Sequence, residues 1–306
     1  MVLKPLLSCP KRHYLTPFDV PKPSPFSHPS EEMFARLLDF YGVEWHYEPR
    51  SFPLQWHPDG TVHEAFTPDF YLPEFDLYVE VTTMRQDLIT RKNRKVRLLR
   101  SVYPHVKIQV FYQKDMRDLE LHADTGNSPG EPPIDHVLFS AEDVERRVRE
   151  LAGKISEDYA GKEVKLLGVL RGSVYFLTEL SRWLRIPARV DFLAISRFAP
   201  DNPSPQRERI VQPPQDPIKG EHVLLVAGIV DLGLSARFLL RELAAREPES
   251  IHICTLLDRS SRRLVPVDIR YSGFEIPDRF VVGCGLDYRQ LYRNLPYIAV
   301  VKPLGA

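Results

Sequence analysis

The regular alternation of apolar runs and helical patterns after residue 134 is the feature that most limits what this chain can fold into. Apolar runs of strand length occupy residues 164–170, 190–195, 223–230 and 251–257. Apolar side chains recur at helical spacing in residues 144–155, 175–184 and 235–246. Parallel strands need crossover connections, which are usually helices. We therefore predict an α/β domain with a mainly parallel sheet and helices on both faces.

The length of the chain predicts a second domain before this one. Single hydrophobic cores rarely grow much past about 250 residues, and the chain has 306. Residues 121–133, LHADTGNSPGEPP, have the composition of a linker. We predict a proline-rich arm at residues 1–28, a first domain at 29–120, the linker at 121–133 and the α/β domain at 134–306.

The first domain is predicted to be a mixed sheet with flanking helices. Ser30 is a suitable N-cap for an opening helix. The apolar stripe of that helix consists of Met33, Phe34, Leu37, Leu38 and Tyr41. Strand-like runs follow at residues 45–47, 66–72, 77–81 and 107–112, and a basic helix is predicted near 91–101.

Composition excludes some classes of protein and leaves others open. Lys and Arg together number 41, as do Asp and Glu, so the net charge indicates no polyanionic partner and a nucleic-acid surface would have to be local. The sequence lacks an apolar run of about 18 residues, so no membrane span is expected. The N-terminus is a poor signal peptide. Cys9, Cys254 and Cys284 lie far apart, which favours free thiols in a reducing cytoplasm.

A strand, a short turn and a helix at residues 222–243 form a candidate phosphate site. The apolar strand ends at Val230, and Asp231, Leu232 and Gly233 lead into a helix near Leu234 and Ser235. Backbone N–H groups at such a helix N-terminus bind anions. Gly233 allows close backbone approach, and the Ser235 hydroxyl can donate to a phosphate oxygen. Taken alone, the pattern fits an ordinary strand-turn-helix equally well.

The surrounding segments resemble the hypoxanthine-guanine phosphoribosyltransferases. The turn is similar to the loop of that family that binds phosphoribosyl pyrophosphate (PRPP). Leu170-Arg171-Gly172-Ser173 matches the pyrophosphate loop, Val190-Asp191-Phe192 precedes the mobile catalytic loop, and residues 273–303 follow the family closely. The resemblance implies a type I phosphoribosyltransferase fold and a pentosyltransferase that converts hypoxanthine or guanine and PRPP to IMP or GMP and pyrophosphate. It also implies Mg²⁺ and self-association into homo-oligomers.

The resemblance assigns roles to individual residues. Phe280 would stack on the purine, Val281 would meet the purine edge through its backbone, and Arg259 would donate to the 6-oxo group where the family has lysine. Asp231 would lie near N7 and manage its proton. Further substrate-binding and metal-binding positions implied by the family are Arg171, Gly172, Gly233, Leu234 and Ser235 for the phosphates, Arg293 for pyrophosphate and Asp287 for Mg²⁺.

The sequence departs from the family pattern at the ribose. Ala227 and Gly228 replace an acidic pair that holds the ribose hydroxyls and the first Mg²⁺, and Leu232 replaces a threonine. The Ser-Tyr pair of the mobile loop is Arg197-Phe198 here. Losing charge-assisted hydrogen bonds costs about 1.5–3 kcal/mol each. The pattern fits a weakened or altered transferase, a domain that senses a purine nucleotide or PRPP, or a scaffold.

Two carboxylates in the first domain form a second candidate site. Asp69 lies on the strand-like run at residues 66–72, and Glu80 lies on the next run. Carboxylates on neighbouring strands can converge on a divalent metal that activates water at a phosphodiester. Glu31 and Glu32 lie on the opening helix. A basic stripe from residue 85 to 100 would suit a phosphate backbone, although a solvated helix face explains it equally well.

This layout resembles the PD-(D/E)XK nucleases, especially the branch of the TnsA-like and very-short-patch-repair-like endonucleases. The phrases that carry the resemblance are residues 47–49, 67–73 and 78–82. It implies metal binding by Asp69 and Glu80, with Mg²⁺ or Mn²⁺, and DNA or RNA binding by Arg91, Lys92 and Lys95. The family lysine after Glu80 is Thr82 here, so Lys92, Lys95 or Gln86 is expected to replace it.

Three functional hypotheses remain open. The first is a hypoxanthine/guanine phosphoribosyltransferase-like enzyme with an added nuclease-like domain. The alternative is a nuclease or nucleic-acid-binding protein that is controlled by a degenerate transferase domain sensing a purine nucleotide or PRPP. A non-catalytic interaction protein is the remaining possibility.

Overall fold

The structure is a computed structural model that describes residues 26–82, 86–112, 134–196, 198 and 209–302, with the side chains of 86–91 left out. The chain divides into two compact units, and each is described by itself. Residues 1–25 of the predicted arm and the predicted linker at 121–133 lie outside the described residues, as do Cys9 and Arg197.

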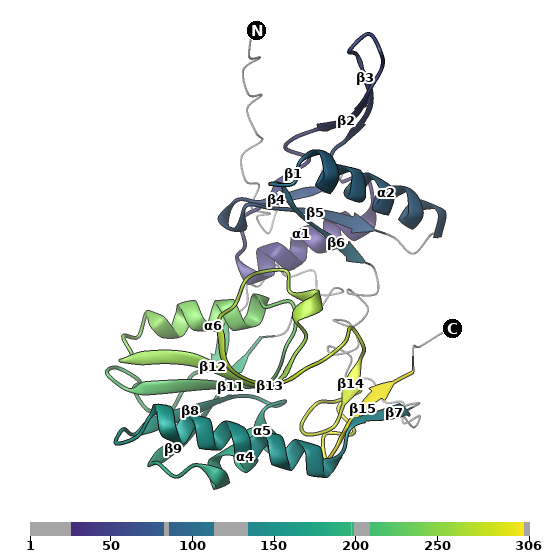
Figure 1. Cartoon of the computed structure of the whole chain (residues 1–306). Coiled ribbons are helices and arrows are strands. Elements are labelled where there is room, and N and C mark those ends of the chain that lie inside the picture. The colour runs from purple at the N-terminus through teal and green to yellow at the C-terminus, as the bar shows by residue number, and fades with distance from the viewer. Residues whose placement is uncertain (1–25, 83–85, 113–133, 197, 199–208, 303–306) are drawn as a thin grey trace, which may run out of the picture. The chain divides into compact units, whose positions relative to one another are not determined.

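The N-terminal unit is a mixed four-stranded sheet between two helices (Figure 1). Its elements are α1 (Pro29–Tyr41), β1 (His46–Tyr47), β2 (Phe52–Trp56), β3 (Val62–Phe66), β4 (Phe70–Leu72), η1 (Pro73–Phe75), β5 (Leu77–Thr82), α2 (Gln86–Val102) and β6 (Lys107–Tyr112). The sheet order is β1-β4-β5-β6, and β2 and β3 form a separate hairpin. Strand β4 is antiparallel to β5, and β5 is parallel to β6.

The two helices of this unit contact opposite faces of the sheet because alternate residues of β6 point to opposite sides. Phe34 of α1 packs against Phe70 and Phe111 at ring centroid distances of 5.0 and 4.7 Å. Leu99 of α2 belongs to a cluster with Ile108 and the hairpin residue Phe52.

The C-terminal unit is built on a six-stranded sheet with the order β10-β9-β8-β11-β12-β13. Its elements are β7 (Ile134–Phe139), α4 (Ala141–Asp158), β8 (Val164–Val169), α5 (Val174–Trp183), β9 (Ala188–Ile195), β10 (Ile210–Gln212), β11 (His222–Val230), α6 (Leu234–Ala244), β12 (Ser250–Asp258), η2 (Ser260–Arg262), β13 (Ile269–Glu275), β14 (Val281–Val282) and β15 (Ile298–Val301). Strands β8, β9, β11, β12 and β13 are parallel, and only β10 is antiparallel to its neighbour. A small antiparallel sheet, β14-β15-β7, lies beside it.

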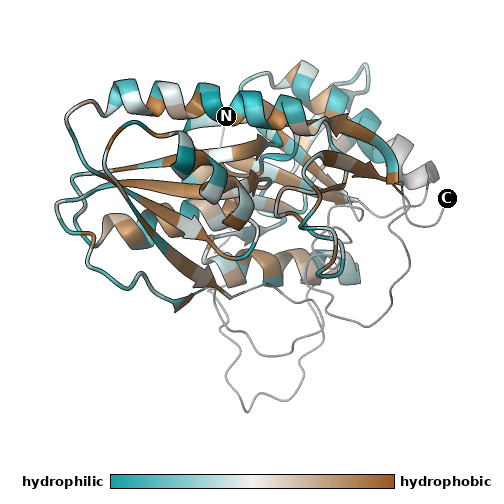
Figure 2. Cartoon of the chain, turned by 90° about the horizontal axis from the view of Figure 1, so that it is seen from below, coloured by the Kyte–Doolittle hydropathy of each residue, from teal (hydrophilic) through white to brown (hydrophobic). Residues whose placement is uncertain are grey.

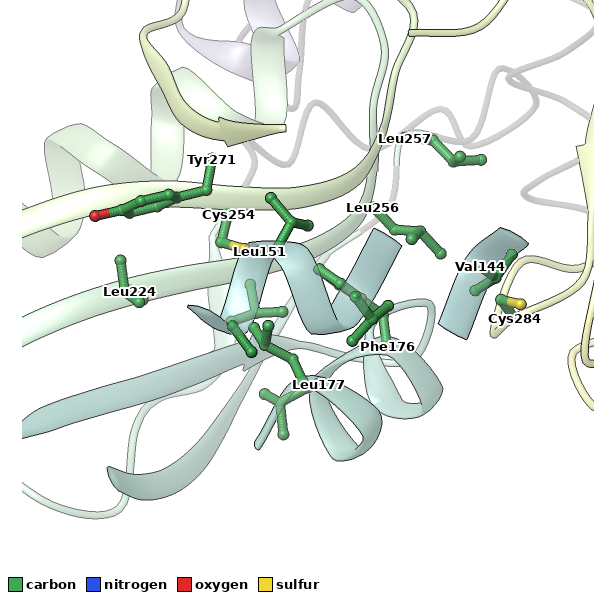
Figure 3. Packing of buried hydrophobic residues seen from close by; sticks show 14 of the residues in the cluster. Val144, Leu151, Phe176, Leu177, Leu224, Cys254, Leu256, Leu257, Tyr271 and Cys284 are labelled. Carbon is green, nitrogen blue, oxygen red and sulfur yellow. The ribbon is translucent and has the colours of Figure 1, made fainter. Parts of the chain in front are cut away.

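Alternate residues along β11 supply two hydrophobic clusters, one on each face of the sheet. Leu224 packs with Leu151 of α4 and Phe176 of α5, whereas Leu225 packs with Leu239 of α6. Figure 3 shows Leu151, Phe176, Leu177, Leu224 and Leu256 of the first cluster. In Figure 2 the strands are mostly hydrophobic, while the helices carry both kinds of residue. This pattern is the physical reason for the two-faced α/β layering predicted from the sequence.

Local details of the helix starts and strands differ from the sequence predictions. Ser140 caps α4 through a capping box with Asp143, as predicted. The cap of α1, however, is His28, whose Nδ1 accepts from the Ser30 N–H at 3.1 Å, because Pro29 occupies the first helical position and needs no N–H partner. The predicted strand at 66–72 is divided into β3 and β4 around Asp69, and the β2 strand was missed.

Two further expectations concern burial. Cys254 and Cys284 are free and buried, as predicted. Within the described ranges, none of the helices combines the length and apolar character needed to traverse a bilayer.

Replacing Phe34 with alanine should destabilise the N-terminal unit strongly. Phe34 is fully buried, and deleting a buried phenylalanine side chain costs about 3–5 kcal/mol in free energy of unfolding. Urea unfolding measures this, with Val62→Ala on the exposed hairpin as the control, for which the change should stay within about 0.5 kcal/mol. Equal effects of the two changes would contradict the packing described for α1.

Candidate functional site

The loops at the carboxyl ends of the central strands meet at one edge of the parallel sheet. Strand β11 lies between β8 and β12. The segments after these strands, at residues 170–173, 231–233 and 259–263, are therefore neighbours. Ligands of open α/β sheets bind at this edge, and the predicted transferase residues lie on these segments, at the start of α6 (Leu234 and Ser235) or on residues 280–293.

The turn after β11 has the geometry expected of a phosphate-binding turn. Gly233 is the N-cap of α6 with a φ of 87°, and a Cβ there would lie 2.6 Å from the Val265 carbonyl oxygen. Only glycine fits this position without strain. The Leu232 carbonyl accepts from the Leu264 and Val265 N–H groups. Leu234 is buried, so a phosphate could meet only its backbone.

Asp231 lies between two buried arginines. Its Oδ2 is 3.3 Å from Arg259 Nη1 and 3.5 Å from Arg262 Nη1. Its Oδ1 is buried and accepts no hydrogen bond from the described residues. Arg259 also donates through Nη2 to the Arg279 carbonyl at 2.7 Å. One guanidinium group therefore links Asp231 to the residue before Phe280.

The predicted purine-binding residues lie on the segment at β14. Phe280 is half-buried and contacts Tyr288 edge-on, with ring centroids 6.1 Å apart. Val281 is buried and pairs with Val300 of β15. The β14–β15 pairing holds the backbone beside Phe280 in place, so its ring is positioned by the small sheet.

A network of hydrogen bonds joins the predicted pyrophosphate residues. The Asp287 carboxylate is buried, with Oδ1 2.7 Å from Arg293 Nη2 and Oδ2 accepting the Gln290 N–H at 2.8 Å. The Gln290 side-chain oxygen accepts from Arg171 at 2.9 Å and from Arg293 at 3.1 Å. Sequence reasoning missed Gln290, because its role depends on contacts between segments that are distant in the sequence.

The predicted ribose side of the site is closely packed at Gly228. A Cβ at Gly228 would lie 2.6 Å from the Gly172 carbonyl oxygen and 3.2 Å from the Leu286 side chain. Both contacts are closer than ordinary van der Waals distances, and the first is with backbone. The Arg197 position of the mobile loop lies outside the described residues, while Phe198 is buried.

The predicted carboxylates of the N-terminal unit meet as expected. Asp69 and Glu80 are both buried, and the Val81 N–H donates to Asp69 Oδ2 at 2.7 Å. Lys92 Nζ lies 2.6 Å from Glu80 Oε1 and 3.6 Å from Asp69 Oδ2, and it donates to the Val81 carbonyl at 2.7 Å. Glu80 Oε2 is buried and has no hydrogen-bond partner among the described residues.

The structure describes the side chains of two residues that were expected to replace the family lysine, Lys92 and Lys95. Lys92 of α2 reaches the carboxylates. Lys95 instead donates to the Ala65 carbonyl at 3.2 Å and lies 6.0 Å from the centre of the Phe66 ring. The side chains of Gln86 and Arg91 lie outside the described residues. Glu31 is buried on α1 and accepts from the Tyr47 hydroxyl at 2.8 Å, whereas Glu32 is exposed.

Burial shifts the proton affinities of this cluster. Burial raises the pKa of Asp69 to about 6, and burial together with the Asp69 charge raises the pKa of Glu80 to about 7. Burial alone would lower the pKa of Lys92, but the two carboxylates outweigh it and the pKa is raised. Lys92 therefore supplies a positive charge where a divalent cation would also be stabilised.

No group of three or more His, Cys, Asp or Glu residues is arranged to hold a metal ion within the part of the chain that the structure describes. The donors that fit a hard cation are the pair Asp69 and Glu80 in one unit and Asp287 in the other.

Comparison with known proteins locates relatives of the C-terminal unit. The family model of the phosphoribosyl transferase domain matches residues 138–289. The hypoxanthine-guanine phosphoribosyltransferase of Mycobacterium avium is 40% identical over 181 residues, which are 57% of this chain and 88% of the relative. The hypoxanthine phosphoribosyltransferase of Salmonella typhimurium is 40% identical over 167 residues, which are 54% of this chain and 94% of the relative.

A solved structure shows the same fold. A hypoxanthine-guanine phosphoribosyltransferase of Bacillus anthracis superposes with a TM-score of 0.52 at 36% identity and covers 55% of this chain and 99% of its own. Its whole length therefore corresponds to little more than half of this chain.

The N-terminal unit should lose stability as the pH rises from about 4.5 to 7. The folded-state pKa values of Asp69 and Glu80 are raised, so the folded state binds more protons than the unfolded state in this window. Glu80→Gln mimics the protonated acid and should raise the free energy of unfolding at pH 8 by on the order of 1 kcal/mol. Thermal unfolding from pH 4.5 to 8 tests this, and an unchanged slope in the variant would refute it.

Proposed function

The chain belongs to the hypoxanthine-guanine phosphoribosyltransferase family through its C-terminal unit, and from this premise we propose that this unit binds a 6-oxopurine together with PRPP. The proposed reaction joins purine N9 to C1′ of the sugar while the bond from C1′ to pyrophosphate breaks. The products are a nucleoside 5′-monophosphate and pyrophosphate.

The observation that carries this proposal is the buried Asp231 Oδ1, which accepts no hydrogen bond from the described residues. A buried acceptor without a donor costs free energy that a ligand N–H group recovers. Purine N7–H is such a donor, and Asp231 would take its proton as N9 reacts. Arg259, held beside Asp231, would donate to the 6-oxo group, and Phe280 would supply the face for stacking.

The 5′-phosphate and the pyrophosphate group of PRPP would be held by two other segments of the site. The N–H groups of the turn at Gly233, Leu234 and Ser235 would bind the 5′-phosphate. Arg171, Gly172 and Arg293 would bind pyrophosphate, because guanidinium groups form strong charge-assisted hydrogen bonds with phosphate oxygens.

Transfer at this site is expected to be weak. Ala227 and Gly228 offer no carboxylate to the ribose hydroxyls, and each lost charge-assisted hydrogen bond costs about 1.5–3 kcal/mol. Each 1.4 kcal/mol is about tenfold in rate, so two losses amount to about a hundredfold or more. Binding of base and phosphates is therefore better supported than rapid turnover.

Asp287 offers a carboxylate for Mg²⁺ in this site, whereas Gly228 does not. The Asp287 carboxylate is the right donor type, although both of its oxygens contact protein groups. When bound there, Mg²⁺ would neutralise charge on pyrophosphate. The Gly228 side lacks a carboxylate for a first ion.

Phe280→Ala should weaken the binding of GMP and IMP by the C-terminal unit by about tenfold or more. The ring supplies the stacking surface, which is worth about 1–3 kcal/mol per base. Calorimetry with GMP, IMP and PRPP in the presence of Mg²⁺ measures this, and the exposed Trp183→Ala on α5 is the matched control. PRPP binding should survive in the Phe280 variant. Absence of binding to all three ligands by the unaltered protein would refute the proposal and leave the scaffold hypothesis.

A second proposed function belongs to the N-terminal unit, as a metal-dependent nuclease of the PD-(D/E)XK type. The observation that favours it is the buried Glu80 Oε2, which has no hydrogen-bond partner among the described residues. This oxygen belongs to a carboxylate that shares Lys92 with Asp69. Mg²⁺ or Mn²⁺, held by Asp69 and Glu80, would activate water and neutralise a phosphodiester. Lys92 would orient the water or stabilise the developing charge.

In this second proposal, DNA or RNA binds along α2. Arg94, Arg97 and Arg100 are exposed on its described part, next to Lys92, and such a basic stripe suits a phosphate backbone. The C-terminal unit would then act as the sensor of a purine nucleotide or PRPP that controls cleavage.

Lys92→Met should remove nuclease activity, whereas Lys95→Met should not. Both changes delete one positive charge from α2, but only Lys92 contacts the carboxylates. We expect a loss of about a hundredfold or more for Lys92→Met and for Asp69→Ala, measured as cleavage of single- and double-stranded DNA with Mg²⁺ or Mn²⁺. Cleavage that persists in the Asp69 variant would exclude this site.

A further inference from the structure

The side chain of Gln290 hydrogen-bonds to both of the arginines that are expected to bind pyrophosphate. Its Oε1 accepts from Arg171 Nη1 at 2.9 Å and from Arg293 Nη2 at 3.1 Å. Arg171 follows β8, and Arg293 lies 122 residues later in the chain. One neutral amide oxygen therefore joins two guanidinium groups from distant segments.

We propose that the Gln290 amide oxygen stands in for a pyrophosphate oxygen, holding Arg171 and Arg293 at the required spacing until pyrophosphate displaces it. This inference rests on the proposed function of the C-terminal unit. It makes Gln290 a positioning residue of the pyrophosphate site, with a role that depends on its being an amide.

The backbone aims Gln290 at this position. Tyr288 and Leu291 exchange N–H to carbonyl hydrogen bonds of 3.2 and 3.1 Å around a tight turn. Its central residues, Arg289 and Gln290, have φ values of 51° and 67°. Such turns normally use Asn and Gly, because other residues are strained at positive φ.

The strained turn is held by Asp287 and not by the turn residues alone. The Gln290 N–H donates to Asp287 Oδ2 at 2.8 Å, while Asp287 Oδ1 contacts Arg293 at 2.7 Å. Strain of this kind persists only where surrounding contacts fix it, and it gathers at binding sites. Both ends of Gln290, backbone and side chain, are thus tied to the same arginine network.

The chemistry of the side chain explains why an amide suits this position. An amide oxygen is a neutral acceptor, whereas a phosphate oxygen carries negative charge, so pyrophosphate adds a coulombic attraction to both guanidinium groups that the amide lacks. The amide therefore keeps the two arginines ordered before the ligand binds, and pyrophosphate can then displace it. A carboxylate in the same place would hold the arginines more tightly than the amide does and would compete with the ligand.

The test compares Gln290→Glu with Leu291→Glu. Leu291 is exposed in the same turn, so its variant adds the same charge without contacting the arginines. Calorimetry with inorganic pyrophosphate is done without added metal, so that the new carboxylate cannot act as a metal ligand. We expect Gln290→Glu to bind pyrophosphate about tenfold more weakly, while its unliganded thermal midpoint rises. Leu291→Glu should change pyrophosphate affinity about twofold at most by general charge repulsion.

Gln290→Met tests whether the Gln290 amide is displaced by pyrophosphate or only stabilises the folded turn. It preserves length but removes the acceptor, so its unliganded midpoint should fall, and its pyrophosphate affinity should fall less than that of Gln290→Glu because no carboxylate competes with the ligand. Equal weakening in the Met and Glu variants would reduce Gln290 to a structural residue and overturn the inference. Unaltered pyrophosphate affinity in Gln290→Glu would overturn it as well and leave the proposed function standing. If the unaltered protein binds GMP but no pyrophosphate, both the inference and the pyrophosphate part of the proposed function fail.

Discussion

The position of β11 in the middle of a parallel sheet is the constraint on which the C-terminal unit depends. Because its neighbours β8 and β12 run in the same direction, the loops that follow the three strands must end at one edge. That edge collects the turn at Asp231, the segment at Arg171 and the segment at Arg259 from distant parts of the sequence. The apolar alternation that buries β11 on both faces is thus also what assembles the site.

Both candidate sites follow the same electrostatic rule, which is that a buried charge needs a partner. Asp231 is paired with Arg259 and Arg262, and Glu80 is paired with Lys92. In each case one carboxylate oxygen is satisfied by protein cations and the other is buried without a donor among the described residues. Burying these two oxygens without a donor costs free energy. A ligand that donates a hydrogen bond to the oxygen, or a cation that binds it, would recover this free energy.

The sequence predicted the parts of this structure that depend on local patterns. The main strands and helices of the parallel sheet follow from apolar periodicity, and Ser140 follows from the capping preference. The α1 cap and the break at Asp69 were missed, because a histidine cap has no common signature and Asp69 interrupts an otherwise apolar run. The choice of Lys92 over Lys95 depends on which turn of α2 faces β5, and the role of Gln290 depends on a left-handed turn. Neither is visible before the chain is folded.

Gly228, where the family that the sequence resembles has an acidic residue, is packed closely by backbone. At Gly228 the Gly172 carbonyl lies where a Cβ would be, and the same carbonyl lies 2.3 Å from the position of a Cβ on Gly285. Backbone of the pyrophosphate loop therefore packs directly against β11 and against the segment that carries Asp287. Restoring a carboxylate at residue 228 would require that loop to move, and the loop also holds Arg171 in its contact with Gln290. Gly172 therefore connects the packing around Gly228 with the segment that carries Asp287 and with the contact between Arg171 and Gln290.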